Sequence, residues 1–421
     1  MMFQKIIALV IFILVMLVII TEKFNRCVAA VGGALLMIIF RVLTFEEGLS
    51  YIDFNTIGVL IGMMLLVAVV KNSGLFEYIA IWTAKKSKGD PWLIMVSFCI
   101  ITAVLSAILD NVTTVLLIGP MTIVVSQILE LNPIPFLMTQ ILSSNIGGTS
   151  TLIGDPPNIM IGSAANLSFL DFVINLGPIV LIILFVTIFC FKFIFKNQLQ
   201  VSDKCKMDIM HLDEKKAIKD MPLLIKSLFV ILFVLFGFMF HQTIHLDSSV
   251  VALIGATVML LIGNQDIDDI LSSIEWSTIL FFTGLFIIVG GLQQVGLINE
   301  LANFLITTTS GHTVITMIVL LWLSAILSSF LDNIPFVATL IPLILTMQTK
   351  GIDVLPLWWA ISLGACLGGN GSLIGASANV VLSNVGSKHG YPISFKDYFK
   401  VGFPLMILSI ILSTGYLLIK F

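Results

Sequence analysis

The sequence predicts an all-α polytopic membrane protein built from two inverted repeats, each with about five transmembrane helices, a re-entrant hairpin and a broken helix. Three observations support this fold. Hydrophobic residues make up 58% of the 421-residue chain and charged residues only 11%, whereas a typical soluble domain is about 25% charged. Apolar runs that approach the ~20 residues needed to cross a bilayer recur along the chain. Finally, motifs of the first half return in the second half.

The uninterrupted apolar runs of the first half predict its simple helices. The first run is not followed by a small-residue cleavage site, so we expect a retained membrane span and not a signal peptide. The next two runs are ordinary spans, a shorter one lies along the interface, and the last crosses the bilayer before the centre of the chain. In order, these predicted segments are 6–20, 25–42, 55–72, 75–84 and 171–195.

Two further apolar regions of the first half are interrupted by polar residues. The run 92–130 is broken at LDNVTT, residues 109–114, and we expect a re-entrant hairpin whose tip carries Asp110 and Asn111. The run 135–165 contains SNIGGTSTLIGDPPN at 144–158. Paired prolines remove backbone donors and glycines favour unwinding, so this stretch cannot be one continuous helix. Because irregular backbone at membrane depth must be buried in protein or line a cavity, we expect a helix broken at a binding site.

A charged segment at 196–226 divides the chain into a first repeat, 1–195, and a second repeat, 227–421. Lysines alternate with acids in this segment, which predicts a solvated linker. Past it the first half recurs with a shift of about 222 residues: LSAILDN at 105–111 returns as LSSFLDN at 327–333, and DFNTI at 53–57 returns as EWSTI at 275–279. Similar composition alone would not preserve one offset over separated motifs.

Five crossings in each repeat would invert the second repeat relative to the first in the membrane. With the central linker cytoplasmic, all but four of the 21 lysines and arginines fall on the cytoplasmic side. These cytoplasmic residues include Lys23 and Arg26, and the four exceptions are Lys5, Arg41, Lys350 and Lys420. The positive-inside rule therefore agrees with the inverted arrangement.

Matched polar breaks in inverted repeats predict a substrate or ion site where the repeats meet. We expect Asn111, Asn145, Asn333 and Asn370 to converge on one cavity, where their oxygens could hold Na⁺. Half-helix N-termini in the same cavity suit an anion. The full set of predicted binding residues is Asp110, Asn111, Thr113, Thr114, Ser144, Asn145, Gly147, Gly148, Thr149, Asp155, Asn158, Asp332, Asn333, Gly368, Gly369, Asn370, Ser372 and Asn379.

Structural roles are open for several of these residues. Asp110 and Asp332 could be N-caps of the second hairpin arms, with or without lining the site, and the glycines could serve close helix packing. Asp155 could cap the half-helix that begins at Pro156. We favour a role in proton or cation coupling for Asp155, because an acid at membrane depth is costly and usually functional. Its repeat counterpart is Ala376.

The motifs resemble the ion transporter superfamily. The resemblance rests on NIGGT at 145–149, IGDPPN at 153–158 and LDN at 109–111 and 331–333, and it covers nearly the whole chain. It is closest to the branch that holds the arsenical pump membrane protein and the melanosomal P protein (pink-eyed dilution). Citrate transporters and divalent anion:sodium symporters are more distant relatives. The resemblance implies a homodimer with a scaffold domain, a transport domain and elevator-like alternating access. Dicarboxylate symporters carry Ser-Asn-Thr at both tips, so the acids at these tips argue against dicarboxylate binding.

The expected function is therefore H⁺- or Na⁺-coupled secondary transport of a small anion or oxyanion-like solute such as arsenite. A Na⁺/H⁺ antiporter or a citrate or dicarboxylate:cation symporter is the alternative. A channel would conduct without counter-ion dependence, and an intramembrane enzyme would need a catalytic motif that the sequence lacks. We expect a multi-pass plasma-membrane protein with no cofactor beyond the coupling ion and no nucleic-acid partner. A separate ATPase subunit stays open as a partner.

Overall fold

The computed structural model describes residues 2–21 and 24–421, and these residues form helices and loops without a β-strand. Within them, nine helices are long and apolar enough to cross a bilayer. The described residues therefore confirm the predicted all-α membrane class. Lys23, counted above among the cytoplasmic lysines, lies outside the described residues.

The helices of the first half follow the predicted order closely. Each of the two interrupted runs is two helices, and the other apolar runs are one helix each. The elements are α1 (Met2–Thr21), α2 (Arg26–Ile39), α3 (Phe45–Ser50), α4 (Phe54–Lys71), α5 (Leu75–Lys86), α6 (Pro91–Ile108), α7 (Asn111–Ile128), α8 (Ile134–Gly148), α9 (Pro156–Ala165) and α10 (Phe169–Ile194).

In the described part of the chain, the second half repeats the ten α-helices of the first half in the same order and adds one 3-10 helix. For instance, α5 and its counterpart α16 each contain 12 residues, and each follows a glycine in the left-handed conformation, Gly74 or Gly296. The elements are α12 (Met221–Phe240), α13 (Ser248–Gly263), α14 (Ile267–Ser272), α15 (Trp276–Gln294), α16 (Leu297–Thr308), α17 (Thr313–Phe330), α18 (Asn333–Thr349), α19 (Leu355–Gly368), the 3-10 helix η3 (Gly369–Gly371), α20 (Ser377–Lys388) and α21 (Phe395–Lys420). The opposite orientation of the two halves in the membrane remains a prediction.

The central linker is more ordered than the alternating charges predict. It contains helix α11 (Asp203–Met210) and the 3-10 helices η1 (Lys196–Gln198) and η2 (Glu214–Ala217). Helix α12 begins at Met221, so the last residues of the predicted 196–226 loop belong to a membrane helix. Asp220 accepts a hydrogen bond from the Leu223 amide and starts that helix, as an aspartate N-cap does.

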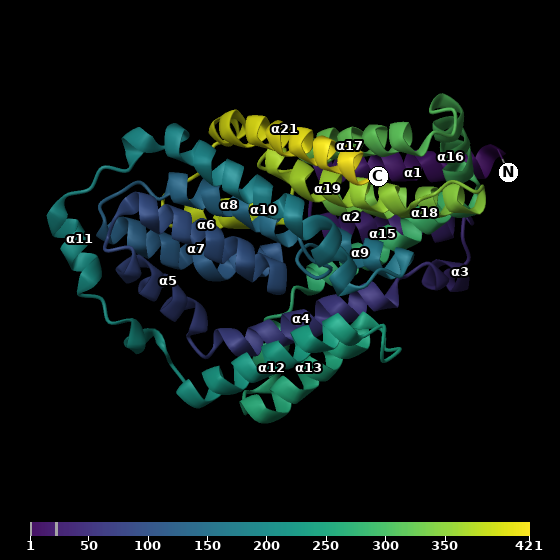
Figure 1. The fold of residues 1–421 in the computed structure, drawn as a ribbon. Coiled ribbons are helices and arrows are strands. Elements are labelled where there is room, and N and C mark those ends of the chain that lie inside the picture. The colour runs from purple at the N-terminus through teal and green to yellow at the C-terminus, as the bar shows by residue number, and fades with distance from the viewer. Residues whose placement is uncertain (1, 22–23) are drawn as a thin grey trace.

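The helix pairs form two kinds of unit. Each hairpin packs on the broken helix of its own half, α6 on α8 and α17 on α19, whereas α2 packs on α15 and α4 on α13, across the halves. Figure 1 shows the hairpin α6–α7 with α8 on one side of the molecule, near α11, and α17, α18 and α19 on the other side. The hairpin tips therefore approach each other from opposite sides.

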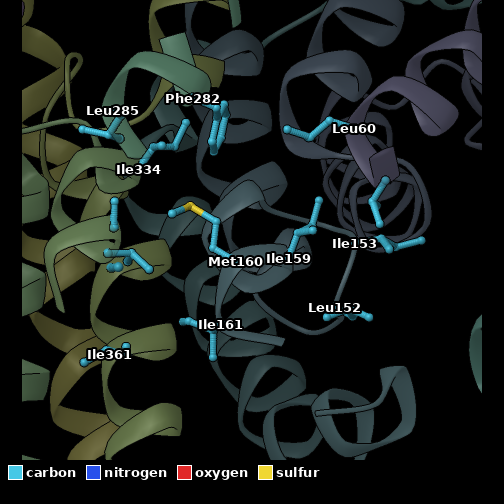
Figure 2. Packing of buried hydrophobic residues seen from close by; sticks show 14 of the residues in the cluster. Leu60, Leu152, Ile153, Ile159, Met160, Ile161, Phe282, Leu285, Ile334 and Ile361 are labelled. Carbon is cyan, nitrogen blue, oxygen red and sulfur yellow. The ribbon is translucent and has the colours of Figure 1, made fainter. Parts of the chain in front are cut away.

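Half-helix α9 lies deep in the apolar core. Ile159, Met160 and Ile161 are each no more than 3% exposed. Figure 2 shows them between helices, with Phe282 and Ile334 on one side and Leu60 on another. Because protein surrounds α9, its preceding irregular segment can survive at membrane depth.

Candidate functional site

The two breaks are held open by a buried asparagine in each repeat. The side-chain amide of Asn158 donates to three carbonyls of the first break, those of Gly148 (3.3 Å), Thr149 (3.2 Å) and Thr151 (2.9 Å). Asn379 does the same in the second break, donating to the carbonyls of Gly369 (2.7 Å) and Ser372 (2.8 Å). A single side chain thus satisfies carbonyls that would otherwise be buried without donors. Both residues act as supports of the breaks and do not line the cavity described below.

The glycines of the first break permit close backbone approach. A Cβ added to Gly147 would lie 2.1 Å from the carbonyl oxygen of Ala103 in α6, and one added to Gly148 would lie 2.4 Å from that of Gly154. Neither neighbour is a side chain that can move aside. The packing alternative raised for these glycines therefore has direct structural support.

A chain of buried amides joins the two repeats. Asn111 donates to Asn145 Oδ1 (3.2 Å), and Asn145 donates to Asn370 Oδ1 (3.0 Å) and Asn379 Oδ1 (2.8 Å). Separately, Asn333 donates to both oxygens of Asp155, at 3.3 Å each. The tips and breaks of the two halves therefore meet, as the matched motifs predicted.

A small cavity lies where the two tips meet half-helix α9. Its volume is about 20 Å³, and a cavity of about 10–15 Å³ already holds one water. Its walls are Arg26, Leu60, Met64, Asp110, Asn111, Val112, Thr113, Asp155, Pro156, Glu275, Thr278, Asn333, Ile334 and Ser377. We call it the tip cavity.

Only some of the predicted residues line the tip cavity. Asp110, Asn111, Thr113, Asp155 and Asn333 do so. Asp332 faces a neighbouring, larger cavity. The remaining predicted residues are in the hairpin, the breaks and their supports: Thr114, Ser144, Asn145, Gly147, Gly148, Thr149, Asn158, Gly368, Gly369, Asn370, Ser372 and Asn379.

The four asparagines assigned to Na⁺ do not offer four free oxygens. The side-chain oxygens of Asn145 and Asn370 already accept amide hydrogen bonds. Among the described residues, Asn111 Oδ1 is buried without a donor, and Asn333 uses its amide group to donate to Asp155. The Asn111 oxygen is therefore a buried acceptor that is free for a ligand. Nor do three or more histidine, cysteine or acidic side chains of the described chain come close enough to hold one metal ion.

The acids of the site play different parts. Asp110 caps α7, accepting from the Thr113 amide at 2.8 Å, and Asp332 caps α18, accepting from the Ile334 amide at 3.1 Å. Asp155 precedes α9 but makes no capping hydrogen bond. It is 1% exposed, and the Asn333 amide donates to both of its oxygens. The capping alternative therefore fits Asp110 and Asp332 and does not fit Asp155.

Sequence reasoning missed four polar residues of the tip cavity: Arg26, Glu275, Thr278 and Ser377. Arg26 forms an ion pair with Asp332 at 3.0 Å. Thr278 donates to Glu275 at 3.0 Å. The repeat could have identified Glu275, because it corresponds to Asp53 as the first residue of the matched motifs at 275–279 and 53–57. Arg26 was used only in the charge count, although it is one of two arginines in the chain.

The charges around the tip cavity do not balance. Asp110, Asp155 and Glu275 line it, and Asp332 lies next to it, whereas Arg26 is the basic residue among the described residues that form its wall. Asp155 is the buried one of these acids, at 1% exposure, and a buried carboxylate without a counter-ion is strongly unfavourable. The site is therefore suited to taking up protons or a small cation.

Paired hairpins and broken helices that meet around a buried polar cavity define a multi-pass membrane transporter. Comparison with known proteins agrees with this class. The family model for citrate transporters (CitMHS) matches residues 16–364, which is most of the chain. The protein belongs to this citrate transporter family, and the relatives below confirm the resemblance to the branch that contains the P protein.

Relatives extend over nearly the whole chain. A 46 kDa membrane protein of Mycobacterium leprae is 41% identical over 425 residues, which cover 99% of each chain. An uncharacterized transporter of Mycobacterium tuberculosis is 40% identical over 426 residues, again 99% of each. The human P protein is 34% identical over 486 residues, which cover 95% of this chain and 58% of that protein.

A solved structure shares the fold. The YdaH transporter of Alcanivorax borkumensis, described as having an unusual topology, matches with a TM-score of 0.58 at 15% identity, over 98% of this chain and 97% of that one. The shared fold supports the helical architecture. The membrane transporters among the relatives also confirm that the protein is not an enzyme.

Proposed function

We propose that the protein is a secondary active transporter that couples the movement of a small anionic solute to H⁺ or Na⁺. The excess of carboxylates around the tip cavity carries this proposal. A cavity of about 20 Å³ has room for one water-sized particle, so the coupling species is a proton or a single dehydrated monovalent cation. We place the coupling at Asp155, which is buried and uses neither oxygen for capping.

The solute itself needs more room than the tip cavity provides. A second cavity of about 350 Å³ adjoins it and shares Arg26 and Ser377 in its wall. Sites for small organic molecules measure about 300–1,000 Å³, so an arsenite-type oxyanion or another small anion fits here. We refer to it as the entrance cavity.

Two other assignments have support of their own. The family model is described by citrate, which supports a citrate or dicarboxylate:cation symporter, although acidic walls oppose a multiply charged anion that arrives without cations. The carboxylate-rich tip cavity taken by itself supports Na⁺/H⁺ antiport. In each case we propose a plasma-membrane homodimer that works by elevator-like movement of the hairpins and broken helices against the scaffold.

Flux into proteoliposomes tests the proposal. Labelled arsenite, citrate, chloride and Na⁺ are supplied in parallel, with a pH gradient, a Na⁺ gradient or neither. We expect one anion to accumulate only when a cation gradient is present and to lose this accumulation when an ionophore collapses the gradient. Na⁺ movement driven by a pH gradient without any anion would favour the antiporter. Anion flux that ignores both gradients would indicate a channel and overturn the proposal.

A further inference from the structure

Arg26 stands in the wall between the two cavities. It is the first residue of α2, and its side chain is 31% exposed. It lines both the entrance cavity and the tip cavity, as does Ser377 at the start of α20. Arg26 and Ser377 are therefore the residues that an anion in the entrance cavity and a proton or cation in the tip cavity would both lie next to.

The guanidinium and the Ser377 hydroxyl converge on one carboxylate oxygen. Arg26 Nη1 donates to Asp332 Oδ2 at 3.0 Å, and Ser377 Oγ donates to the same oxygen at 2.9 Å. Arg26 Nη1 also donates to Ser377 Oγ. Asp332 thus shows that these donors can bind a carboxylate. Charge-assisted bonds of this kind are the strong ones.

Two residues of α15 fix the direction of the guanidinium. Its Nη2 donates to Thr278 Oγ1 at 3.4 Å, and its central carbon lies 5.3 Å from the centre of the Phe281 ring. Both partners belong to α15. A cation held over an aromatic face and bonded to a hydroxyl is preorganised, so the donors would stay in place after Asp332 left them.

The other repeat has no such arrangement. The repeat equivalent of Arg26 is Ser248, and that of Ser377 is Pro156. Asp110, the equivalent of Asp332, has no ion pair among the described residues and accepts only from the backbone of its own helix. The capping role is common to both tips, whereas the arginine contact is specific to the second. Capping therefore does not explain why Arg26 is present.

We propose that Arg26, with Ser377, is the anion-recognition site of the transporter, and that Asp332 is an internal carboxylate which an entering anion displaces. This inference rests on the proposed function and assigns its anion to named donors. The entering group is a carboxylate or oxyanion, because it must replace one oxygen that accepts two hydrogen bonds. Displacement leaves Asp332 without its cation beside three other carboxylates, so anion binding increases the demand for a proton or Na⁺ in the tip cavity.

Purified protein in detergent provides the first test, with acetate, citrate, phosphate and arsenite as the probe anions and the melting temperature as the readout. The D332N variant removes the competing charge, and asparagine can still cap α18. If Asp332 leaves the donors of Arg26 and Ser377 unoccupied about a tenth of the time in the wild type, D332N should bind the preferred anion about tenfold more tightly than the wild type does. R26Q and the double variant R26Q/D332N should lose this binding, and R26K should retain part of it.

The double variant controls for misfolding, because it removes both charges of the Arg26–Asp332 ion pair and so leaves no unpaired charge in the site. Two results would overturn the proposal: D332N that binds every probe no more tightly than the wild type does, or R26Q/D332N that binds as tightly as D332N. This readout needs no transport. Cation-coupled anion flux with an unchanged KM in R26Q would refute the recognition site and leave the proposed function standing. If D332N binds an anion tightly through Arg26 but the wild type shows no coupled flux, the recognition site stands and the proposed function is refuted.

Discussion

Replacing Asp155 with asparagine should separate coupling from folding. The carboxylate is 1% exposed, and no ion pair within the described residues includes it. Burying one ionised group costs several kcal/mol. Hydrogen bonds to a charged group return about 1.5–3 kcal/mol, and here Asn333 supplies them from 3.3 Å. The charge is therefore a net cost to the fold, and Asp155→Asn should melt no lower than the wild type.

Gradient-driven transport, in contrast to stability, should fall in Asp155→Asn. Asparagine retains an oxygen for Asn333 but can neither bind a proton nor attract a cation. Coupling free energies between sites are typically about 1–3 kcal/mol, or roughly 5- to 150-fold, so gradient-driven accumulation should fall within that range. The assay is flux into proteoliposomes against pH and Na⁺ concentration, with expression and melting temperature measured on the same preparations.

Asp53 provides the matched control, because it is a carboxylate with a structural role. It accepts from the amides of Asn55 (3.0 Å) and Thr56 (3.2 Å) and from the Ser163 hydroxyl (3.0 Å). Asp53→Asn should lower stability by about 1 kcal/mol and leave the cation dependence of flux intact. If Asp155→Asn keeps the wild-type pH and Na⁺ dependence, the reasoning is refuted and coupling must be sought at Asp110 or Glu275. Ala376→Asp, at the repeat-related position, should change the ion preference.

Three further changes test the architecture. Single cysteines at Lys216 and Thr308, introduced after replacement of the five native cysteines, should react with an impermeant reagent from opposite sides of the membrane; reaction from one side would contradict the inverted arrangement. Asn158→Ala should destabilise the protein by about 2–4 kcal/mol, since it leaves three carbonyls and the Ser362 hydroxyl without a partner; unchanged melting would show that Asn158 does not support the break. The hydrogen bond from Lys85 lowers the pKa of Glu214 in the linker, so the ionised form favours docking of η2 on α5. That contribution is present above the ordinary pKa of glutamate, about 4.3, and is lost as the pH falls through the lower folded value. Protease cleavage of the linker should therefore rise at acid pH in the wild type and change little with pH in Glu214→Gln.

The sequence predicted the helical elements because membrane helices leave strong local signals. Apolar runs set their length, and prolines, glycines and aspartates mark their ends. Helix α4 was expected at 55–72 and spans Phe54–Lys71. Helix α7 begins directly after Asp110, as the predicted hairpin tip requires. The meeting of the breaks followed from the repeat, because matched interruptions in two repeats serve a purpose only where they face each other.

The sequence could not predict which polar residues of the site support the breaks and which line the tip cavity. Asn158 and Asn111 are both buried asparagines next to a helix start, yet one holds a break open and the other presents a free oxygen to the tip cavity. The difference depends on which donors and acceptors the fold has already used. Arg26 begins α2 and Glu275 precedes α15. Only the packing of these helices in the folded protein brings the two charges to the tip cavity.

The distribution of charge over the two repeats follows from these contacts. The backbone is repeated element by element, so both tips receive an aspartate cap and both breaks receive a supporting asparagine. The charges are not repeated: Asp155 corresponds to Ala376, and Arg26 corresponds to Ser248. An arginine neutralises one tip acid, while Asp155 is left without a cation. A symmetric charge pattern would give the two halves of the site the same ion preference, whereas the proposed function places the anion beside Arg26 and the coupling cation beside Asp155. We therefore propose that the repeated backbone forms the frame of the transport pathway and that the unmatched residues determine what each part of it binds.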